Sequence, residues 1–206
     1  RLRCDWSSDV CSSDLSTGKF VGEVKHIQLN NLEFERAGKI NAVGYSYDRK
    51  YFYTGINDKG LKLWDAATFT LVHHFNKTAE VDGADFSSDG KWLAIGAGSV
   101  VHVYRVSDFS LVHRFAHEKG AVNNVDFNHD NTLLASCASK GEVFITRTSD
   151  WKRIRRHKLR SSAKRIYFSP DGTLYALSGR DQYCKVHQTR SEEHTSELRS
   201  HLNLVC

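Results

Sequence analysis

The sequence is short of several features that define large classes of proteins. It has no methionine and five cysteines, three of which (Cys4, Cys11 and Cys206) lie close to the ends. The other two, Cys137 and Cys184, are far apart, so we expect neither a disulfide framework nor a C-x-x-C metal or redox site. No apolar run approaches the roughly 20 residues that a membrane-spanning helix needs. We therefore predict that the chain does not span a membrane.

Motifs of common catalytic sites are also missing. The sequence contains no G-x-S-x-G, no H-E-x-x-H, no phosphate-binding glycine loop and no G-x-G-x-x-G. Eleven histidines include the pair His73-His74, but neighbours in a strand point to opposite faces, so a regular strand does not let both chelate one ion. We expect no enzymatic activity, no cofactor and no metal site.

What the sequence does contain is a repeat. Four aromatic residues stand 41 positions apart, and an aspartate follows each of them three positions later. The aromatic residues are Tyr45, Phe86, Phe127 and Phe168, and the aspartates are Asp48, Asp89, Asp130 and Asp171. A register of this kind indicates copies of one supersecondary unit, and it predicts the fold before any single motif is considered.

Each copy reads as four short strands joined by polar turns. Apolar residues at fixed offsets precede the aromatic residue, as Val122 and Val125 precede Phe127, which is typical of a half-buried strand. The next turn holds the aspartate, whose carboxylate can bond nearby backbone amides. Three more strands follow, in the third copy over 134–136, 143–145 and 151–157. No segment has helical periodicity, so the sequence predicts an all-β fold.

Four strands in each unit of about 41 residues resemble the WD-repeat β-propeller family. Trp64-Asp65 stands at the end of a third strand, where that family carries the dipeptide for which it is named. Ser169-Pro170-Asp171-Gly172 matches the family's usual first turn. The resemblance covers about residues 35–189. It implies a partial propeller of about four four-stranded antiparallel blades in an open, unclosed arc.

Members of this family hold a blade together with a hydrogen-bonded set of His, Ser or Thr, Asp and Trp, and here the set is divided between copies. The first copy has the Thr, the Asp and the Trp. The third copy has the His and the Ser, with Lys140 and Thr146 where the aspartate and the tryptophan belong. The resemblance implies a structural role for Thr54, Asp58, Trp64, Asp65, His117 and Ser136.

The register also predicts how the chain is divided. Residues 16–36 read as the end of a preceding blade, because Phe34 stands 41 positions before Phe75, which ends a fourth strand. Most members of the family close a ring of about seven blades, so we expect this chain to be an internal piece of a larger propeller. The predicted units are 16–36 (the end of a blade), 37–76, 77–117 and 118–158 (whole blades) and 159–189 (a truncated blade).

The two ends differ in kind from the repeats. Residues 5–15 and 190–198 resemble translated sequencing-library adapters, and one inverted DNA element can encode both peptides in different frames. We therefore expect 1–15 and 190–206 to be adapter-derived, non-native tails. Natural disordered tails rich in Ser and Glu are the alternative.

Without these tails the chain is more basic. Of its 29 basic and 24 acidic residues, the tails hold four and six, which leaves 25 against 18 and a formal charge of +7 for 16–189. The strongest concentration comprises Lys152, Arg153, Arg155, Arg156, Lys158, Lys164 and Arg165. One interpretation is an edge strand whose charges keep it from pairing with other chains. The other is an electrostatic patch over 152–165 that binds nucleic acid or anionic lipid.

The resemblance implies a non-enzymatic scaffold that binds other proteins. In this family the loops leading into each first strand, and those between second and third strands, line one rim and usually meet partners. The charged rim candidates are Arg36, Lys77, Lys119 and Arg160. We expect a cytoplasmic location, with the nucleus as the alternative. A third class of function, an enzyme or exchange factor, would need segments outside this chain.

Overall fold

The computed structural model describes residues 39–56, 60–76, 79–180 and 184–189. Both predicted tails, the segment 16–36 and the candidate residues Arg36, Asp58 and Lys77 lie outside these ranges. Every regular element within them is a β-strand, and fifteen strands form four antiparallel sheets. The prediction of an all-β fold is confirmed.

The first three sheets contain four strands and the last contains three, always in chain order. The first sheet is β1 (Ile40–Tyr45), β2 (Tyr51–Ile56), β3 (Gly60–Asp65) and β4 (Leu71–Phe75). The second is β5 (Val81–Phe86), β6 (Trp92–Ala97), β7 (Val100–Arg105) and β8 (Leu111–Ala116). The third is β9 (Val122–Phe127), β10 (Leu133–Ala138), β11 (Glu142–Arg147) and β12 (Arg153–Lys158). The fourth is β13 (Ala163–Phe168), β14 (Leu174–Gly179) and β15 (Cys184–Gln188).

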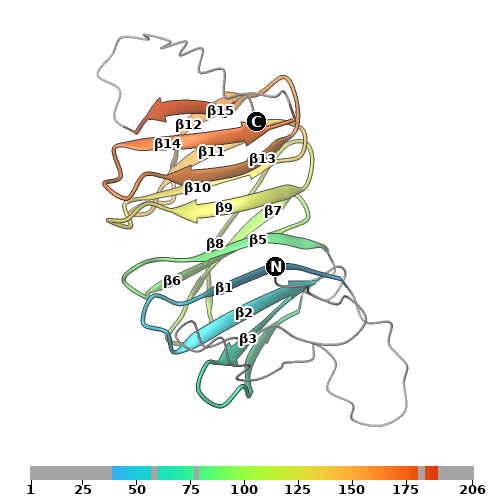
Figure 1. The fold of residues 1–206 in the computed structure, drawn as a ribbon, viewed down its shortest axis with the longest axis vertical. Coiled ribbons are helices and arrows are strands. Elements are labelled where there is room, and N and C mark those ends of the chain that lie inside the picture. The colour runs from blue at the N-terminus through green and yellow to red at the C-terminus, as the bar shows by residue number, and fades with distance from the viewer. Residues whose placement is uncertain (1–38, 57–59, 77–78, 181–183, 190–206) are drawn as a thin grey trace, which may run out of the picture.

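The four sheets stack as the blades of an open propeller (Figure 1). The first strands β1, β5, β9 and β13, which we call the innermost strands, follow one another along the stack and pack side by side. Within the described ranges no strand closes the row into a ring. Val43 and Tyr45 on β1 are 69% and 63% exposed, whereas Phe86, which corresponds to Tyr45 in the next sheet, is buried. The prediction of an open arc of blades is confirmed.

Apolar clusters fill the spaces between consecutive sheets. The cluster between the first two sheets includes Leu63 and Phe86, and the cluster between the last two includes Ile145 and Ile166. A third cluster lies between the second and third sheets. Burying a side chain of this size contributes about 1.5–3 kcal/mol. Each sheet is therefore stabilised mainly by its neighbours in the stack, as expected for a repeat architecture.

Polar bonds join the innermost strands across the same spaces. The carboxylate of Asp85 on β5 accepts the backbone N–H of Phe127 at 2.8 Å, and that of Asp126 on β9 accepts the N–H of Phe168 at 2.7 Å. Among the described residues neither carboxylate forms an ion pair. Burial raises the pKa of Asp85 to about 8 and that of Asp126 to about 7.

The joint between β1 and β5 is built differently. Residue 44 occupies the place of these aspartates but is a glycine, and the Tyr53 hydroxyl of β2 donates to the carbonyl oxygen of Ala84 instead. A Cβ on Gly44 would lie 2.5 Å from the Tyr53 hydroxyl oxygen. Glycine is therefore needed for the tyrosine to cross to the next sheet.

The recurring aspartates occupy the turns between first and second strands. Each accepts the backbone N–H of the residue two positions later, at 3.0–3.1 Å. In the last of these turns, hydrogen bonds from the Ser169 hydroxyl and from Thr173 lower the pKa of Asp171 to about 2. The prediction that these carboxylates bond nearby backbone amides is confirmed.

The fourth strands begin later than the sequence suggested. In the third copy we predicted strand over 151–157, but β12 begins at Arg153. Trp151 has a φ of 54°, and the corresponding Phe69 and Phe109 have φ values of 57° and 56°. These are left-handed conformations, which few non-glycine residues adopt and which do not continue a strand. The aromatic residue therefore belongs to the turn.

Candidate functional site

Each innermost strand contains one residue that its pairing with the second strand skips. In β1, Ile40 pairs with Ile56 and Ala42 pairs with Gly55, so the register shifts at Asn41. This β-bulge recurs at intervals of 41 residues in all four sheets. The bulged residues are Asn41, Asp82, Asn123 and Lys164. Bulges redirect side chains and are frequent beside functional sites.

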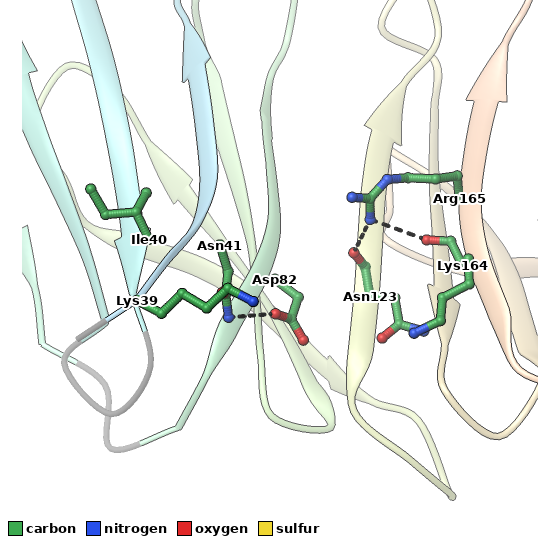
Figure 2. A pocket seen from close by; sticks show the side chains of 7 residues that line it. All are labelled: Lys39, Ile40, Asn41, Asp82, Asn123, Lys164 and Arg165. Atoms are coloured by element: carbon green, nitrogen blue, oxygen red, sulfur yellow. Dashed lines mark hydrogen bonds between the residues drawn. The ribbon is translucent and has the colours of Figure 1, made fainter. Parts of the chain in front are cut away.

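The four bulged residues line one hollow (Figure 2). Its volume is about 470 Å³, and Lys39, Ile40 and Arg165 complete its lining. Residues of β1 and β5 form one side, and residues of β9 and β13 form the other. We call it the mouth hollow, because it lies where the innermost strands begin. The repeat therefore brings equivalent positions from four sheets to one place.

The acidic side of the mouth hollow is centred on Asp82. The side-chain amide of Asn41 donates to Asp82 Oδ1 at 2.9 Å and to Glu80 Oε1 at 2.7 Å. Burial and the nearby Glu80 raise the pKa of Asp82, against the opposing effects of Asn41 and the cations across the hollow. Asp82 is half-buried, so its carboxylate lies close to the surface of the hollow.

The basic side chains of the mouth hollow form no ion pair with another described residue. Arg165 donates to the backbone carbonyl oxygens of Asn123 and Lys164, at 3.1 and 3.2 Å. Within the described part of the chain, neither Arg165 nor the two lysines, Lys39 and Lys164, form an ion pair with a carboxylate. Three cations are therefore available at the surface of the hollow.

The basic residues of the outer strand β12 are in a different situation. Arg156 donates to both carboxylate oxygens of Glu118, at 2.9 and 2.8 Å, and to Glu142 at 2.7 Å. Arg155 donates to a backbone carbonyl at the end of β15. The guanidinium of Arg153 lies 3.6 Å from the centre of the Phe144 ring.

The predicted basic patch over 152–165 is divided by the fold. Strand β12 is the outermost strand of the third sheet, and β13 is an innermost strand. Lys164 and Arg165 therefore lie at the mouth hollow, whereas the five basic residues of the segment 152–158 that belong to the patch lie on or beside the outer strand. The seven residues do not form one surface. A linear run hides this, because the connection from β12 to β13 crosses the full width of a sheet.

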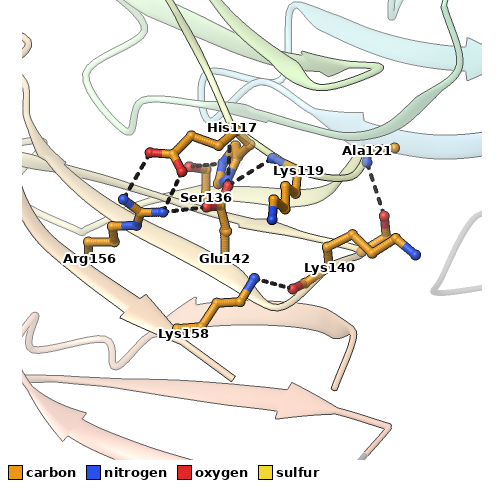
Figure 3. A network of polar contacts seen from close by, with 10 residues as sticks. His117, Lys119, Ala121, Ser136, Lys140, Glu142, Arg156 and Lys158 are labelled. Carbon is orange, nitrogen blue, oxygen red and sulfur yellow. Dashed lines mark hydrogen bonds and ion pairs between the residues drawn. The ribbon is translucent and has the colours of Figure 1, made fainter. Parts of the chain in front are cut away.

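Glu142, at the start of β11, organises the loop beside the mouth hollow (Figure 3). Its side chain is 1% exposed, and its carboxylate accepts the backbone N–H groups of Glu118 and Lys119, at 2.8 and 3.2 Å, in addition to the Arg156 guanidinium. Burial opposes ionisation, but these donors outweigh it and hold the pKa of Glu142 below its usual value. Glu142 was not among the predicted motif residues, because the expected carboxylate position was 140.

His117 packs against this carboxylate in the third sheet. Its Nε2 lies 3.0 Å from the Ser136 hydroxyl, its Nδ1 lies 3.7 Å from Glu142, and its ring stacks on Phe144 with 4.1 Å between ring centres. Burial lowers the pKa of His117 to about 4. Glu142 and Phe144 thus contact His117 from positions two residues away from 140 and 146, where the aspartate and the tryptophan were expected. Phe144 stacks on the imidazole but, unlike a tryptophan, donates no hydrogen bond.

The remaining motif residues lie in the first sheet. Trp64 Nε1 donates to the Thr54 hydroxyl at 2.9 Å in a buried position. The carboxylate of Asp65 accepts the backbone N–H groups of Ala67 and Thr68, at 3.0 and 2.8 Å, and so fixes the turn before β4. The structure brings these pairs together within one sheet.

Two of the predicted rim residues are described. Lys119 and Arg160 are exposed and lie in the loops that lead into β9 and β13, at the end of the stack that also carries the mouth hollow.

Among the described residues, no group of three or more His, Cys, Asp or Glu side chains is arranged to hold a metal ion. The same part of the chain has no helix that is long and apolar enough to span a membrane.

Comparison with known proteins connects these features to a family. A family profile described as "WD domain, G-beta repeat" matches residues 29–65, 67–105 and 109–145. Eukaryotic translation initiation factor 3 subunit I of Vanderwaltozyma polyspora is 23% identical over 176 residues, which are 74% of this chain and 50% of that protein. Target of rapamycin complex subunit LST8 of Mus musculus is 22% identical over 173 residues, 77% of this chain and 52% of that protein.

A WD repeat domain-containing protein 83 homolog of Dictyostelium discoideum is 27% identical over 115 residues, 55% of this chain and 35% of that protein. The chain spans about half the length, or less, of these curated relatives. The profile matches cover more than half of the 206 residues, and the matches at 67–105 and 109–145 each span the fourth strand of one sheet and the first three strands of the next. This chain therefore belongs to the WD-repeat family.

Proposed function

We propose that the chain is a non-enzymatic scaffold that binds other proteins at the rim where the innermost strands begin. One observation carries the proposal: four bulges, one in each sheet, direct polar side chains into a single hollow at that rim. Two of the relatives are named as subunits, of an initiation factor and of a complex, which supports a role in contacts with other proteins.

The loops at the same rim extend the proposed binding surface. Lys119 and Arg160 present exposed charges there, and Glu142 fixes the backbone of the Lys119 loop without engaging the lysine side chain. A rigid loop with a free side chain suits recognition, because little conformational freedom is lost on binding. Arg36 and Lys77, which the repeat in the sequence assigns to loops equivalent to those of Lys119 and Arg160, are included in the proposal.

The alternative, a binder of nucleic acid or anionic lipid through 152–165, receives less support. Arg153, Arg155 and Arg156 already contact an aromatic ring, a backbone carbonyl and two carboxylates. Charges engaged in this way contribute less to binding a polyanion than free ones. The interpretation of β12 as a charged edge that resists pairing with other chains explains these residues more simply.

We also propose that the chain is part of a larger propeller, divided at the predicted boundaries of 16–36, 37–76, 77–117, 118–158 and 159–189. The greater length of the relatives and the exposure of Val43 and Tyr45 support this division. Sequencing the transcript upstream of residue 16 and downstream of residue 189 tests it. Further in-frame repeats are expected, and stop codons directly beyond residues 16 and 189 would refute it.

The rim assignment is tested by capturing partners with matched variants. Partners retained from a cell lysate by the tagged chain are identified and quantified by mass spectrometry. Reversing charge with Lys119→Glu and Arg160→Glu is expected to reduce specific partners about tenfold while leaving the circular-dichroism spectrum unchanged. The control, Lys152→Glu with Arg155→Glu, makes the same charge change on the outer strand. Equal losses from both pairs would refute the rim assignment.

A further inference from the structure

The lining of the mouth hollow combines three cations that form no ion pair with another described residue with one carboxylate, that of Asp82. Lys164 and Arg165 come from β13, and Lys39 directly precedes β1, so positive charge reaches the hollow from both ends of the row of innermost strands. Within the described ranges these three cations have no carboxylate partner. An anionic group of a ligand would supply the missing partner of these cations, because opposite charges within a few ångströms attract strongly at a partly buried site.

Asp82 adds a requirement of the opposite kind. Its Oδ1 accepts the Asn41 amide, and no donor among the described residues is bonded to its Oδ2. A carboxylate oxygen of this kind accepts N–H groups. The hollow therefore offers cations that can bind an anionic group of a ligand and a carboxylate oxygen that can accept a hydrogen bond from an N–H group of the same ligand. A peptide that carries a Glu or Asp side chain offers both, through its carboxylate and its backbone N–H groups.

Nucleic acid fits the hollow less well. Its bases are commonly held by stacking on aromatic side chains. The lining consists of Lys39, Ile40, Asn41, Asp82, Asn123, Lys164 and Arg165, and none of these is aromatic. The volume of about 470 Å³ lies within the range of roughly 300–1,000 Å³ that is usual for small ligand sites.

We propose that the mouth hollow binds a short acidic segment of a partner protein. An acidic side chain of the partner lies against Lys164 and Arg165, and a neighbouring backbone N–H donates to Asp82. This inference rests on the proposed scaffold function and names the chemistry of the partner at that rim. It also gives the four repeated bulges a common purpose, because each of them directs a side chain into the same recognition site.

The test measures binding of a fluorescein-labelled hexaglutamate peptide by fluorescence anisotropy at low salt. Lys164→Glu with Arg165→Glu is expected to weaken binding about tenfold, the equivalent of about 1.4 kcal/mol. The matched control, Arg114→Glu with Lys152→Glu, makes the same charge change at exposed positions on the outer side of the sheets. We expect the control to stay within about twofold of the unchanged chain. Equal weakening, or no binding of the peptide to the unchanged chain, overturns the proposal.

Asp82→Asn separates a peptide from a simple anion. If Asp82 accepts a peptide N–H, its replacement by the weaker acceptor reduces the affinity for hexaglutamate. Equal or tighter binding overturns the peptide assignment, since removing a negative charge favours any anion. Single-stranded oligouridylate and phosphatidylserine vesicles serve as competing probes. Displacement of the peptide by either at lower concentration than by unlabelled hexaglutamate identifies a nucleic-acid or lipid site and overturns the proposal.

Failure here is distinguishable from failure of the scaffold function. If Lys119→Glu with Arg160→Glu reduces captured partners but Lys164→Glu with Arg165→Glu does not, the rim binds proteins and the acidic-segment proposal is wrong. If neither pair changes the captured partners, the rim assignment fails as well.

Discussion

Charged side chains are paired at the outer edge of the third sheet, whereas those of the innermost strands form no ion pairs among the described residues. At the edge, Arg156 contacts the carboxylates of Glu118 and Glu142. Glu142 is almost fully buried, and the guanidinium of Arg156 balances its charge. Along the innermost strands, neither Asp85 nor Lys164 forms an ion pair with another described residue. The raised pKa keeps the Asp85 carboxyl protonated at neutral pH, so the unpaired charge is that of Lys164, which lies at the mouth hollow. Paired buried charges fix a structure, whereas unpaired ones cost stability and remain available to an external partner. The contrast separates a structural network from a candidate binding surface.

The pKa values of the acids follow the same division. Burial works against ionisation of both Glu142 and Asp85. At Glu142 two backbone N–H groups and a guanidinium overcome it, and the pKa falls. At Asp85 the backbone N–H groups of Phe127 and Phe86 are not enough to overcome burial and the nearby Asp126, no cation assists them, and the pKa rises to about 8. The partners of a carboxylate, rather than its burial alone, decide its charge at neutral pH.

The largest expected effect is on the paired side. Glu142→Ala removes the acceptor for two backbone N–H groups and one guanidinium, and leaves the N–H groups without a partner. We expect a loss of about 2–4 kcal/mol in the free energy of unfolding, measured in urea. Glu142→Gln keeps one acceptor oxygen and should lose less. Glu80→Ala, at an exposed acid of the mouth hollow, is the control and should stay within about 0.5 kcal/mol. A similar loss of stability from Glu80→Ala would contradict the view that Glu142 is structural and the mouth hollow is not.

A smaller, pH-dependent effect is expected on the unpaired side. The pKa of Asp85 is raised in the folded state to about 8, so its stabilising contribution is fully present below the unfolded value, near pH 4, and is lost as the pH rises through about 8. Asp85→Asn keeps an oxygen for the Phe127 N–H but has no charge. The variant should therefore gain stability over the unchanged chain as the pH rises from 4 to 9.

This gain should be on the order of 1–2 kcal/mol at pH 9, because water screens the part of the side chain that is not buried. Urea unfolding at a series of pH values measures it. A difference between the two proteins that does not change with pH would contradict the assignment.

The smallest effect compares two cations directly. Lys164→Met removes an unpaired charge, so its melting temperature should stay within about 2 °C of the unchanged chain. Arg156→Met removes bonds to Glu118 and Glu142 and should lower the melting temperature clearly. Differential scanning calorimetry measures both. Equal decreases in melting temperature would show that Lys164 stabilises the fold as Arg156 does. The mouth hollow would then be a structural network rather than a binding surface.

Much of the fold could be predicted because it follows from periodicity. The interval of 41 residues placed Phe86 and Phe127 in equivalent strands, and both are buried as one register requires. The bulges could not be predicted, because one extra residue in a strand leaves the apolar pattern almost unchanged. A signal was nevertheless present. Polar residues recur at 41, 82, 123 and 164, within strands whose neighbouring residues are largely apolar or small.

The candidate site was harder to predict, for reasons of geometry. Glu142 replaces an expected carboxylate two positions earlier, and the turn before it passes through Gly141 with a φ of 82°. A Cβ there would lie 2.5 Å from the carbonyl oxygens of Leu159 and Ser161, so a tight approach of two loops sets the position of the acid. Sequence spacing does not encode that approach. It equally conceals the separation of Lys158 from Lys164 by the width of a sheet.

The glycine at position 44 has a consequence for how the stack comes apart. Burial and the nearby Asp85 raise the pKa of Tyr53, so the phenol that joins β1 to β5 keeps its proton in mildly alkaline solution. The next two joints rely on carboxyls that lose theirs near pH 7 and 8. Alkali therefore acts unevenly along the molecule. As the pH rises, we expect amide hydrogen exchange to accelerate first at the contacts of the third sheet with the second and the fourth. The contact between the first two sheets should remain protected.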